Sequence, residues 1–147
     1  MRNDSRLSRM LHVLLHMARQ AKPFTSEQIG EMLKTNPVVV RRTMAGLRDA
    51  GYVTSVTGPG GGWTIACDLE KTTLLDIQKA VGGPNLFVIG IDNPNPVCAV
   101  ERAVNAALSE AMERAERMLL DRLGEVSLAS LAIHFGGLCE GNHGSAK

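Results

Sequence analysis

The chain has 147 residues, a length that suits one ordinary domain or a small domain with a helical extension. Apolar residues make up 44 % of it and aromatic residues only 3 %, so the core must be built from aliphatic side chains and methionine, as in packed helices. Charged residues make up 21 %, which argues against a disordered chain.

The net charge of +1 hides a difference between the two halves of the chain. Residues 1–65 contain nine Lys or Arg and four Asp or Glu, while residues 66–147 contain seven and eleven, so the halves carry +5 and −4. This pattern indicates a polyanionic partner for the first half only. Two ordinary solvated surfaces are the alternative interpretation.

The cysteines and apolar runs indicate the cellular compartment. Three cysteines, at positions 67, 98 and 139, form no Cys-x-x-Cys pair, so neither a zinc knuckle nor a disulfide framework is predicted. The apolar stretch over 10–18 is short, is interrupted by histidines and lacks a cleavage site, so it does not predict a signal peptide. The longest later apolar run, 86–91, is far too short to span a bilayer. We therefore expect a cytoplasmic protein without a membrane partner.

The first half of the chain predicts three helices with short connections. Apolar residues recur at helical spacing over 5–20. Thr25 and Gln28 have the spacing of a capping box and start a second helix. Asn36, a good N-cap followed by proline, starts a third helix, which we expect to end at Gly51.

A change of period follows the third predicted helix. Residues 52–57 and 63–66 are rich in β-branched side chains and alternate, which predicts two strands joined by the glycine-rich turn 58–62. These glycines lead into a strand and lack the Gly-Lys-Ser/Thr ending of a nucleotide P-loop, so nucleotide binding is not expected. Three helices and a β-hairpin are the order of a winged helix-turn-helix.

The second half predicts more helices. Thr73 with Asp76 opens a short helix, 84–96 is loop-like, and a long helix over 97–123 precedes a short one over 126–135. The predicted fold class is therefore mainly α with a small β-hairpin. Its predicted units are a winged helix-turn-helix DNA-binding domain over 1–83, a loop, long dimerisation helix and short final helix over 84–135, and a flexible tail over 136–147.

The long helix predicts a homodimer. A helix of about 25 residues extends about 38 Å, more than a small domain can cover. Its apolar stripe is formed by Val100, Val104, Leu108, Ala111, Met112, Ala115 and Leu119. A second copy in a symmetric dimer is the simplest partner for this stripe, and packing within one chain is the alternative.

The third predicted helix carries the candidate DNA contacts. In a helix-turn-helix its exposed face enters the major groove, and arginines there pair with guanine or phosphate. That face consists of Asn36, Val38, Val39, Arg41, Arg42 and Arg48. A solvated arginine face is the alternative, but a glycine-tipped hairpin, with Gly60 and Gly61, can also approach DNA closely.

Two stretches of this sequence resemble a known family. NPVVVRRTMAGLRDAG over 36–51 and SVTGPGGGW over 55–63 resemble the Rrf2 family of bacterial winged helix-turn-helix transcription regulators, and the likeness covers 5–135. The resemblance implies a homodimer with crossed long helices on a roughly palindromic operator, and we expect a repressor. Family positions that meet double-stranded DNA fall on Asn36, Val38, Val39, Arg41, Arg42, Thr57 and Gly60. Thr57 replaces a wing arginine and Arg41 an acidic residue of better-known members, so a different operator is expected.

The same resemblance bears on cofactors. Cluster-binding members carry three cysteines near the start of the long helix, whereas this chain has only Cys98 there, with Glu101 in place of a histidine. Some members take ligands from the partner's first helix, where His12 and His16 stand here. We expect no cofactor, because a cluster normally needs four ligands, and keep an iron–sulfur regulator as an alternative.

Four further interpretations remain. His134, Cys139 and His143 are three soft metal ligands in ten residues, but unrelated residues of a glycine-flanked tail are the simpler interpretation. No nucleophile with an activating base and no paired carboxylates appear, so we do not expect an enzyme. A winged helix that binds protein instead of DNA is the main rival function. Cys98, at the start of the long helix, is either a redox sensor or a small residue filling a pocket.

Overall fold

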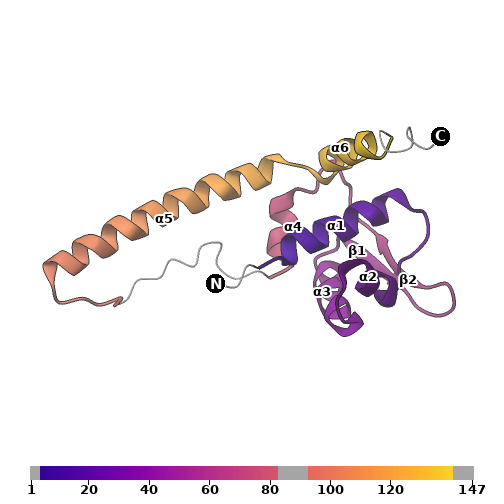
Figure 1. Ribbon diagram of the computed structural model, residues 1–147, viewed down its shortest axis with the longest axis horizontal. Helices are drawn as coiled ribbons and strands as arrows, with labels where there is room; N and C mark the ends of the chain where they lie inside the picture. Colours follow the sequence, from indigo (N-terminus) through magenta and orange to yellow (C-terminus); the bar gives the residue numbers. More distant parts are fainter. Residues whose placement is uncertain (1–3, 83–92, 141–147) are drawn as a thin grey trace, which may run out of the picture.

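A computed structural model describes residues 4–82 and 93–140 of the chain, with side chains described as far as residue 134. It is mostly helical with one two-stranded hairpin, which confirms the predicted fold class (Figure 1). The elements are α1 (Arg6–Arg19), α2 (Ser26–Leu33), α3 (Pro37–Asp49), β1 (Val53–Val56), β2 (Gly62–Ile65), α4 (Leu74–Ala80), α5 (Ala99–Glu125) and α6 (Leu128–Glu140). None of the described helices is long and apolar enough to cross a membrane.

Local side-chain bonds start three of the helices at the predicted residues. The Thr25 hydroxyl accepts from the Gln28 backbone N–H at 3.1 Å, and the Gln28 side chain accepts from the Thr25 N–H at 2.9 Å. Asn36 caps α3 by accepting from the backbone N–H of the second helical residue. Thr73 and Asp76 form a second capping box at the start of α4. These bonds satisfy backbone N–H groups that a helix start leaves without partners.

The core is mostly aliphatic, with Phe24 and Trp63 as its aromatic members, and it is shared by nearly all elements. Its fully buried side chains include Val13, Leu14, Ile29, Val40, Met44, Leu47, Val53, Ile77 and Leu128. Most of them come from α1, α2 and α3 at the helical spacing seen in the sequence. Leu128 begins α6 and is 0 % exposed, so a residue from beyond the long helix completes the core of the N-terminal domain.

The hairpin is joined to the helices on one side. β1 pairs with β2 in antiparallel register, and the Gly61 N–H donates to the Gly58 carbonyl across the turn at 3.0 Å. Phe24, between α1 and α2, exchanges two backbone hydrogen bonds with Trp63 of β2 at 3.0 and 2.7 Å. The buried Trp63 indole N–H also donates to the Ser26 hydroxyl on α2 at 3.0 Å. The base of the wing is therefore held to the helix that precedes α3.

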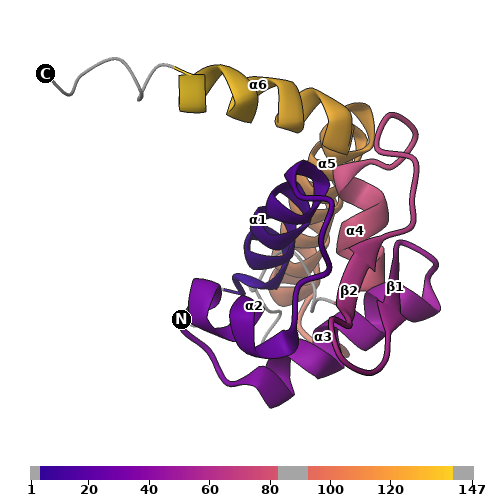
Figure 2. The ribbon, with the colours of Figure 1, turned by 90° about the vertical axis from the view of Figure 1, so that its right-hand side faces the viewer.

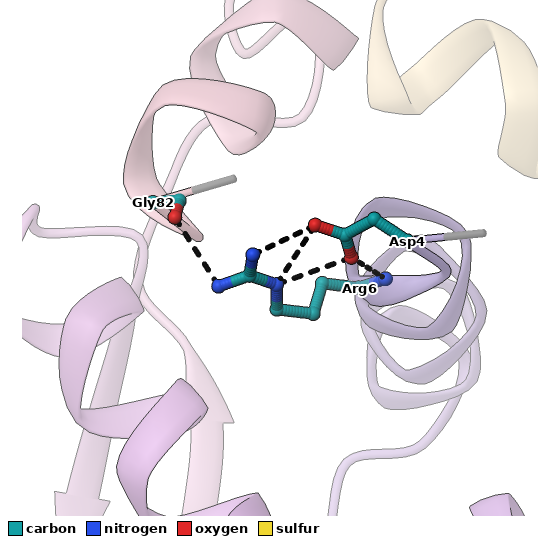
Figure 3. Close-up of polar contacts among 3 residues, drawn as sticks. All are labelled: Asp4, Arg6 and Gly82. Carbon is teal, nitrogen blue, oxygen red and sulfur yellow. Dashed lines mark hydrogen bonds and ion pairs between the residues drawn. The ribbon is translucent and has the colours of Figure 1, made fainter. Parts of the chain in front are cut away.

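A polar contact joins the start of α1 to the end of α4 (Figure 3). The Arg6 guanidinium donates to the Gly82 carbonyl at 3.2 Å and pairs with the Asp4 carboxylate at 2.7 Å. Side-chain hydrogen bonds from Arg6, with its backbone N–H, hold the pKa of Asp4 below its ordinary value. A cation just past the C-terminal end of α4 also interacts favourably with that helix dipole.

The long helix α5 extends away from the domain, which its C-terminal end alone approaches (Figures 1 and 2). There the Leu74 N–H donates to the Val126 carbonyl at 3.0 Å, and the Leu128 N–H donates to the Thr72 carbonyl at 2.9 Å. α5 has 27 residues, and none of them is buried. Most residues along the rest of α5 are exposed or half-buried, and the Asn105 side chain donates to the Asn93 carbonyl at 2.8 Å.

The last helix is longer than predicted. α6 continues through Gly136 and Gly137 to Glu140, five residues into the stretch expected to be a flexible tail. The prediction was wrong there because a glycine pair ends a helix only where the chain turns away, and within a helix each glycine costs only about 1 kcal/mol relative to alanine. The rest of the expected tail, 141–147, lies outside the described residues.

Candidate nucleic-acid interface

The exposed face of α3 combines apolar and basic side chains. Val38 is 54 % exposed and Val39 is 49 % exposed, although the next residue, Val40, is buried. Both exposed valines stand in the first turn of α3, where a recognition helix meets base edges. Apolar side chains at that place can contact thymine methyl groups.

Asn36 precedes this face and already has a structural bond. Its side-chain oxygen accepts from the Val38 N–H at 2.8 Å, which leaves its amide N–H₂ group as the part able to donate to DNA. The sequence placed Asn36 both as helix cap and as DNA contact, and the geometry allows both uses.

The three arginines of α3 have different surroundings. Arg41 pairs with Glu27 of α2 at 2.5 Å, and both side chains remain more than half exposed. Arg48, in the last turn, pairs with the adjacent Asp49 at 3.3 Å. Arg42 is exposed, and no ion pair joins it to any side chain within 4–82 or 93–134. Only Arg42 therefore presents a guanidinium without a carboxylate beside it.

The predicted DNA contacts in the wing differ in the space around them. Gly60 has a φ of +75°, and a side chain there would meet no atom within 4 Å, so this position faces open space. At Gly61 an added Cβ would lie 2.2 Å from the Val56 carbonyl oxygen, so the turn itself requires glycine. Thr57 is exposed just before the turn. Gly61 thus has a structural reason to be glycine besides any approach to DNA.

The apolar stripe of α5 is open to solvent. Val100, Val104 and Leu108 are 71 %, 50 % and 39 % exposed. Ala111 and Ala115 are exposed as well, and Met112 and Leu119 are half-buried. Met118, which the sequence reasoning did not include, is 75 % exposed on the same helix. Most of the predicted stripe is therefore exposed in one chain, and Met112 and Leu119 are partly covered.

Cys98 is the N-cap of α5 and is exposed. The neighbouring backbone N–H groups of Glu101 and then Val100 lower the pKa of its thiol below the ordinary value. These N–H groups belong to the first turn of the helix, which has no internal partners for them. A thiolate is therefore stabilised at this position, with open access for a reagent.

The metal-ligand candidates do not come together within one chain. The Nε2 atoms of His12 and His16 are 3.1 Å apart on α1, whereas Cys98 and Glu101 stand at the far end of α5 (Figure 1). No group of three or more His, Cys, Asp or Glu gathers in the part of the chain that the structure describes. One cysteine at the start of α5 does not supply the four ligands that a cluster normally needs.

The three candidate metal ligands near the C-terminus are described to different extents. His134 lies on α6, where its Nδ1 contacts the Ser130 carbonyl at 2.8 Å. Cys139 falls within α6 in a part whose side chains are not described, and His143 lies outside the described residues.

Sequence reasoning missed Glu27. An acidic residue in the first turn of a helix has an ordinary explanation in the helix dipole, so nothing in the sequence connected it to Arg41, fourteen positions later. The fold brings the two side chains together because α2 and α3 pack against each other in the helix-turn-helix (Figure 2).

Comparisons with known proteins agree with this architecture. A family model, Rrf2, described as an iron-dependent transcriptional regulator, matches residues 3–134. YwnA of Bacillus subtilis, whose name describes an HTH-type transcriptional regulator, is 33 % identical over 131 residues, which cover 89 % of this chain and 97 % of YwnA. A crystal structure described as a DNA binding protein is 31 % identical, with a TM-score of 0.68, and the match covers 86 % of this chain and 98 % of that one. CymR, the global cysteine regulator of B. subtilis, shares the fold at 20 % identity and a TM-score of 0.65, over 91 % of this chain and 98 % of CymR.

Proposed function

This chain belongs to the Rrf2 family of transcriptional regulators, and we propose that it is a repressor that binds a palindromic operator as a cytoplasmic homodimer. Members of this family are DNA-binding regulators and not enzymes. The observation that carries the proposal is the surface of α3, where half-exposed Val38 and Val39 stand beside exposed Arg41 and Arg42. Half-exposed valines beside arginines match a major-groove surface of methyl groups, acceptors and phosphates.

The helix and the wing divide the contacts in this proposal. The first two turns of α3 enter the major groove, with Asn36 and the arginines donating to bases or phosphates. The wing, through Thr57 and Gly60, lies along the backbone or the minor groove, where the absence of a side chain permits close approach. Arg48, at the far end of α3, meets a phosphate at the edge of the site.

The dimer in this proposal forms along α5. A helix of 27 residues without a buried residue needs a partner, and a second copy offers the same exposed stripe. The two-fold axis then presents two copies of α3 to two half-sites, so the dimer sets the half-site spacing.

Cys98 detects the signal, an oxidant, in this proposal. Its thiolate attacks one oxygen of hydrogen peroxide, the O–O bond breaks, hydroxide leaves and takes up a proton, and a sulfenic acid forms on sulfur. Its exposure and its lowered pKa support this assignment. The chain then acts without an iron–sulfur cluster, since it offers one cysteine where a cluster requires several ligands.

A retardation assay tests the proposal. Wild-type protein should shift a small set of genomic fragments, with its own promoter among the first to try, and random duplex should compete poorly. The protein isolated without oxygen should contain no stoichiometric iron, and peroxide should weaken binding in wild type but not in Cys98→Ser. Equal affinity for every fragment at every salt concentration would instead favour a winged helix that binds protein.

A further inference from the structure

We propose that Glu27 is a positioning residue that commits Arg41 to reading a base edge instead of pairing with a phosphate. This inference rests on the proposed function, because it assigns a role within the same DNA-binding surface. It concerns a residue of α2 that is not itself on the recognition helix.

The geometry places the pair where α2 and α3 meet. Glu27 is the second residue of α2 and Arg41 the fifth residue of α3, and the Arg41 Nη2 group donates to the Glu27 carboxylate at 2.5 Å. The side chains of Arg41 and Glu27 are 53 % and 62 % exposed, so the pair forms part of the outer surface. Val38, one helical turn before Arg41, is exposed on the same side of α3.

The carboxylate changes what the arginine can do. The ion pair of a guanidinium and a carboxylate has little net charge. A phosphate brought near this pair is attracted by the guanidinium but repelled by the carboxylate. Arginine has five N–H donors in a fixed plane, and the bond to Glu27 leaves others to meet the acceptors N7 and O6 of guanine. The bond also restricts the long side chain before DNA arrives, so less freedom is lost on binding.

Arg42 provides the contrast on the same helix. It is exposed and has no ion-pair partner among the side chains of residues 4–82 and 93–134, so its full charge is available to a phosphate. Two adjacent arginines thus have different tasks, set by one carboxylate on the neighbouring helix. Arg41 carries sequence selectivity, and Arg42 carries salt-dependent affinity.

The experiment uses full-length protein and a duplex that the wild type itself selects from a random duplex library, with an unselected duplex as competitor. Affinities for both duplexes are measured over a range of potassium chloride for wild type, Arg41→Ala, Arg42→Ala, Glu27→Gln and the double variant Glu27→Gln/Arg41→Ala. Glu31→Gln is the matched control, because Glu31 is exposed one turn further along α2 and no ion pair joins it to the described residues.

The expected results separate the roles. Arg41→Ala should lower the ratio of selected to unselected affinity by about 5- to 150-fold with little change in the salt slope. Arg42→Ala should lower both affinities together and reduce the slope by about 0.9. Glu27→Gln should lower the ratio by about fivefold and raise affinity for unselected duplex with a steeper slope, since Arg41 becomes free to meet phosphate. Glu31→Gln should leave the ratio unchanged, and circular dichroism should show equal folding for all variants.

Two results would overturn the inference while leaving the proposed function intact. One is a Glu27→Gln protein whose ratio and salt slope equal those of Glu31→Gln. The other is a loss of selectivity from Glu27→Gln that is as large in the Arg41→Ala background as in wild type, because Glu27 would then act without Arg41. A wild type that selects no sequence would overturn the proposed function itself.

Discussion

Replacing Leu108 with glutamate tests the dimer most directly. At about 2 kcal/mol for fully burying a valine or leucine, the exposed fractions of Val100, Val104 and Leu108 correspond to about 3 kcal/mol for one chain and about 6 kcal/mol for a symmetric pair. Association itself costs at least about 4 kcal/mol, so these three side chains alone give a weak dimer, and the rest of the stripe is also needed.

The glutamate acts twice in a symmetric dimer. Each copy loses the burial of a leucine and places a carboxylate in an apolar contact, and an unpaired buried charge costs about 3–5 kcal/mol. We therefore expect a total loss of at least about 5 kcal/mol, which raises the dimer dissociation constant by more than about 1000-fold. Operator affinity should fall as well, since each chain then binds only one half-site.

Light scattering at micromolar concentration measures the outcome. Wild type should have twice the chain mass of 15.8 kDa, and Leu108→Glu should have the mass of one chain. Arg117→Gln is the matched control, because it makes the same change in charge nine residues later, on the opposite face of α5. A Leu108→Glu protein that stays dimeric, or an Arg117→Gln protein that dissociates, would refute the assignment of this stripe as the interface.

Four further outcomes are expected. Trp63→Phe removes a buried hydrogen bond between β2 and α2 and should lower the free energy of unfolding in urea by about 1–3 kcal/mol. Gly62→Ala should destabilise the protein more than Gly60→Ala in the same assay, because its Cβ would lie 2.5 Å from a backbone oxygen whereas the other would meet nothing. Iodoacetamide should label Cys98 in the folded protein with a midpoint pH below that of the urea-unfolded protein, as its lowered pKa requires. Burial, then the charges of neighbouring cations, lowers the pKa of His16, so folding favours its neutral form. This stabilisation is present above the unfolded pKa of 6.5 and is lost as pH falls below it, so thermal stability should decline more from pH 7.5 to 5 in wild type than in His16→Gln.

Local rules predicted most of the fold. The caps at Thr25, Asn36 and Thr73 depend on side chains within three positions of the backbone groups they satisfy, so the sequence alone contains the whole interaction. The buried faces of α1, α2 and α3 likewise follow from helical spacing of apolar side chains. Gly51, with a φ of +88°, stands where a left-handed residue is needed to end α3.

The parts that sequence could not predict depend on contacts between distant residues. The pairing of Phe24 with Trp63, and of Thr73 with Ser127, brings in Phe24, Thr73 and Ser127, which show no strand pattern of their own. The Glu27–Arg41 pair is likewise formed only when α2 and α3 pack. For the candidate site, residue types and faces were predictable, but the partners that decide how each arginine acts were not.

The length of α5 restricts how a signal at Cys98 can reach DNA. Cys98 caps one end of a 27-residue helix, and the other end joins the DNA-binding domain through Val126 and Leu128. The helix separates these points by about 40 Å. Within the described residues, α5 therefore gives oxidation of Cys98 no short path to α3 of its own chain, and in the proposed dimer a chemical change there acts on α3 by altering how two copies of α5 pack. In the proposed dimer the sensor and the reading helix are connected through the partner subunit, so the dimer interface is the element whose two arrangements a signal must select between.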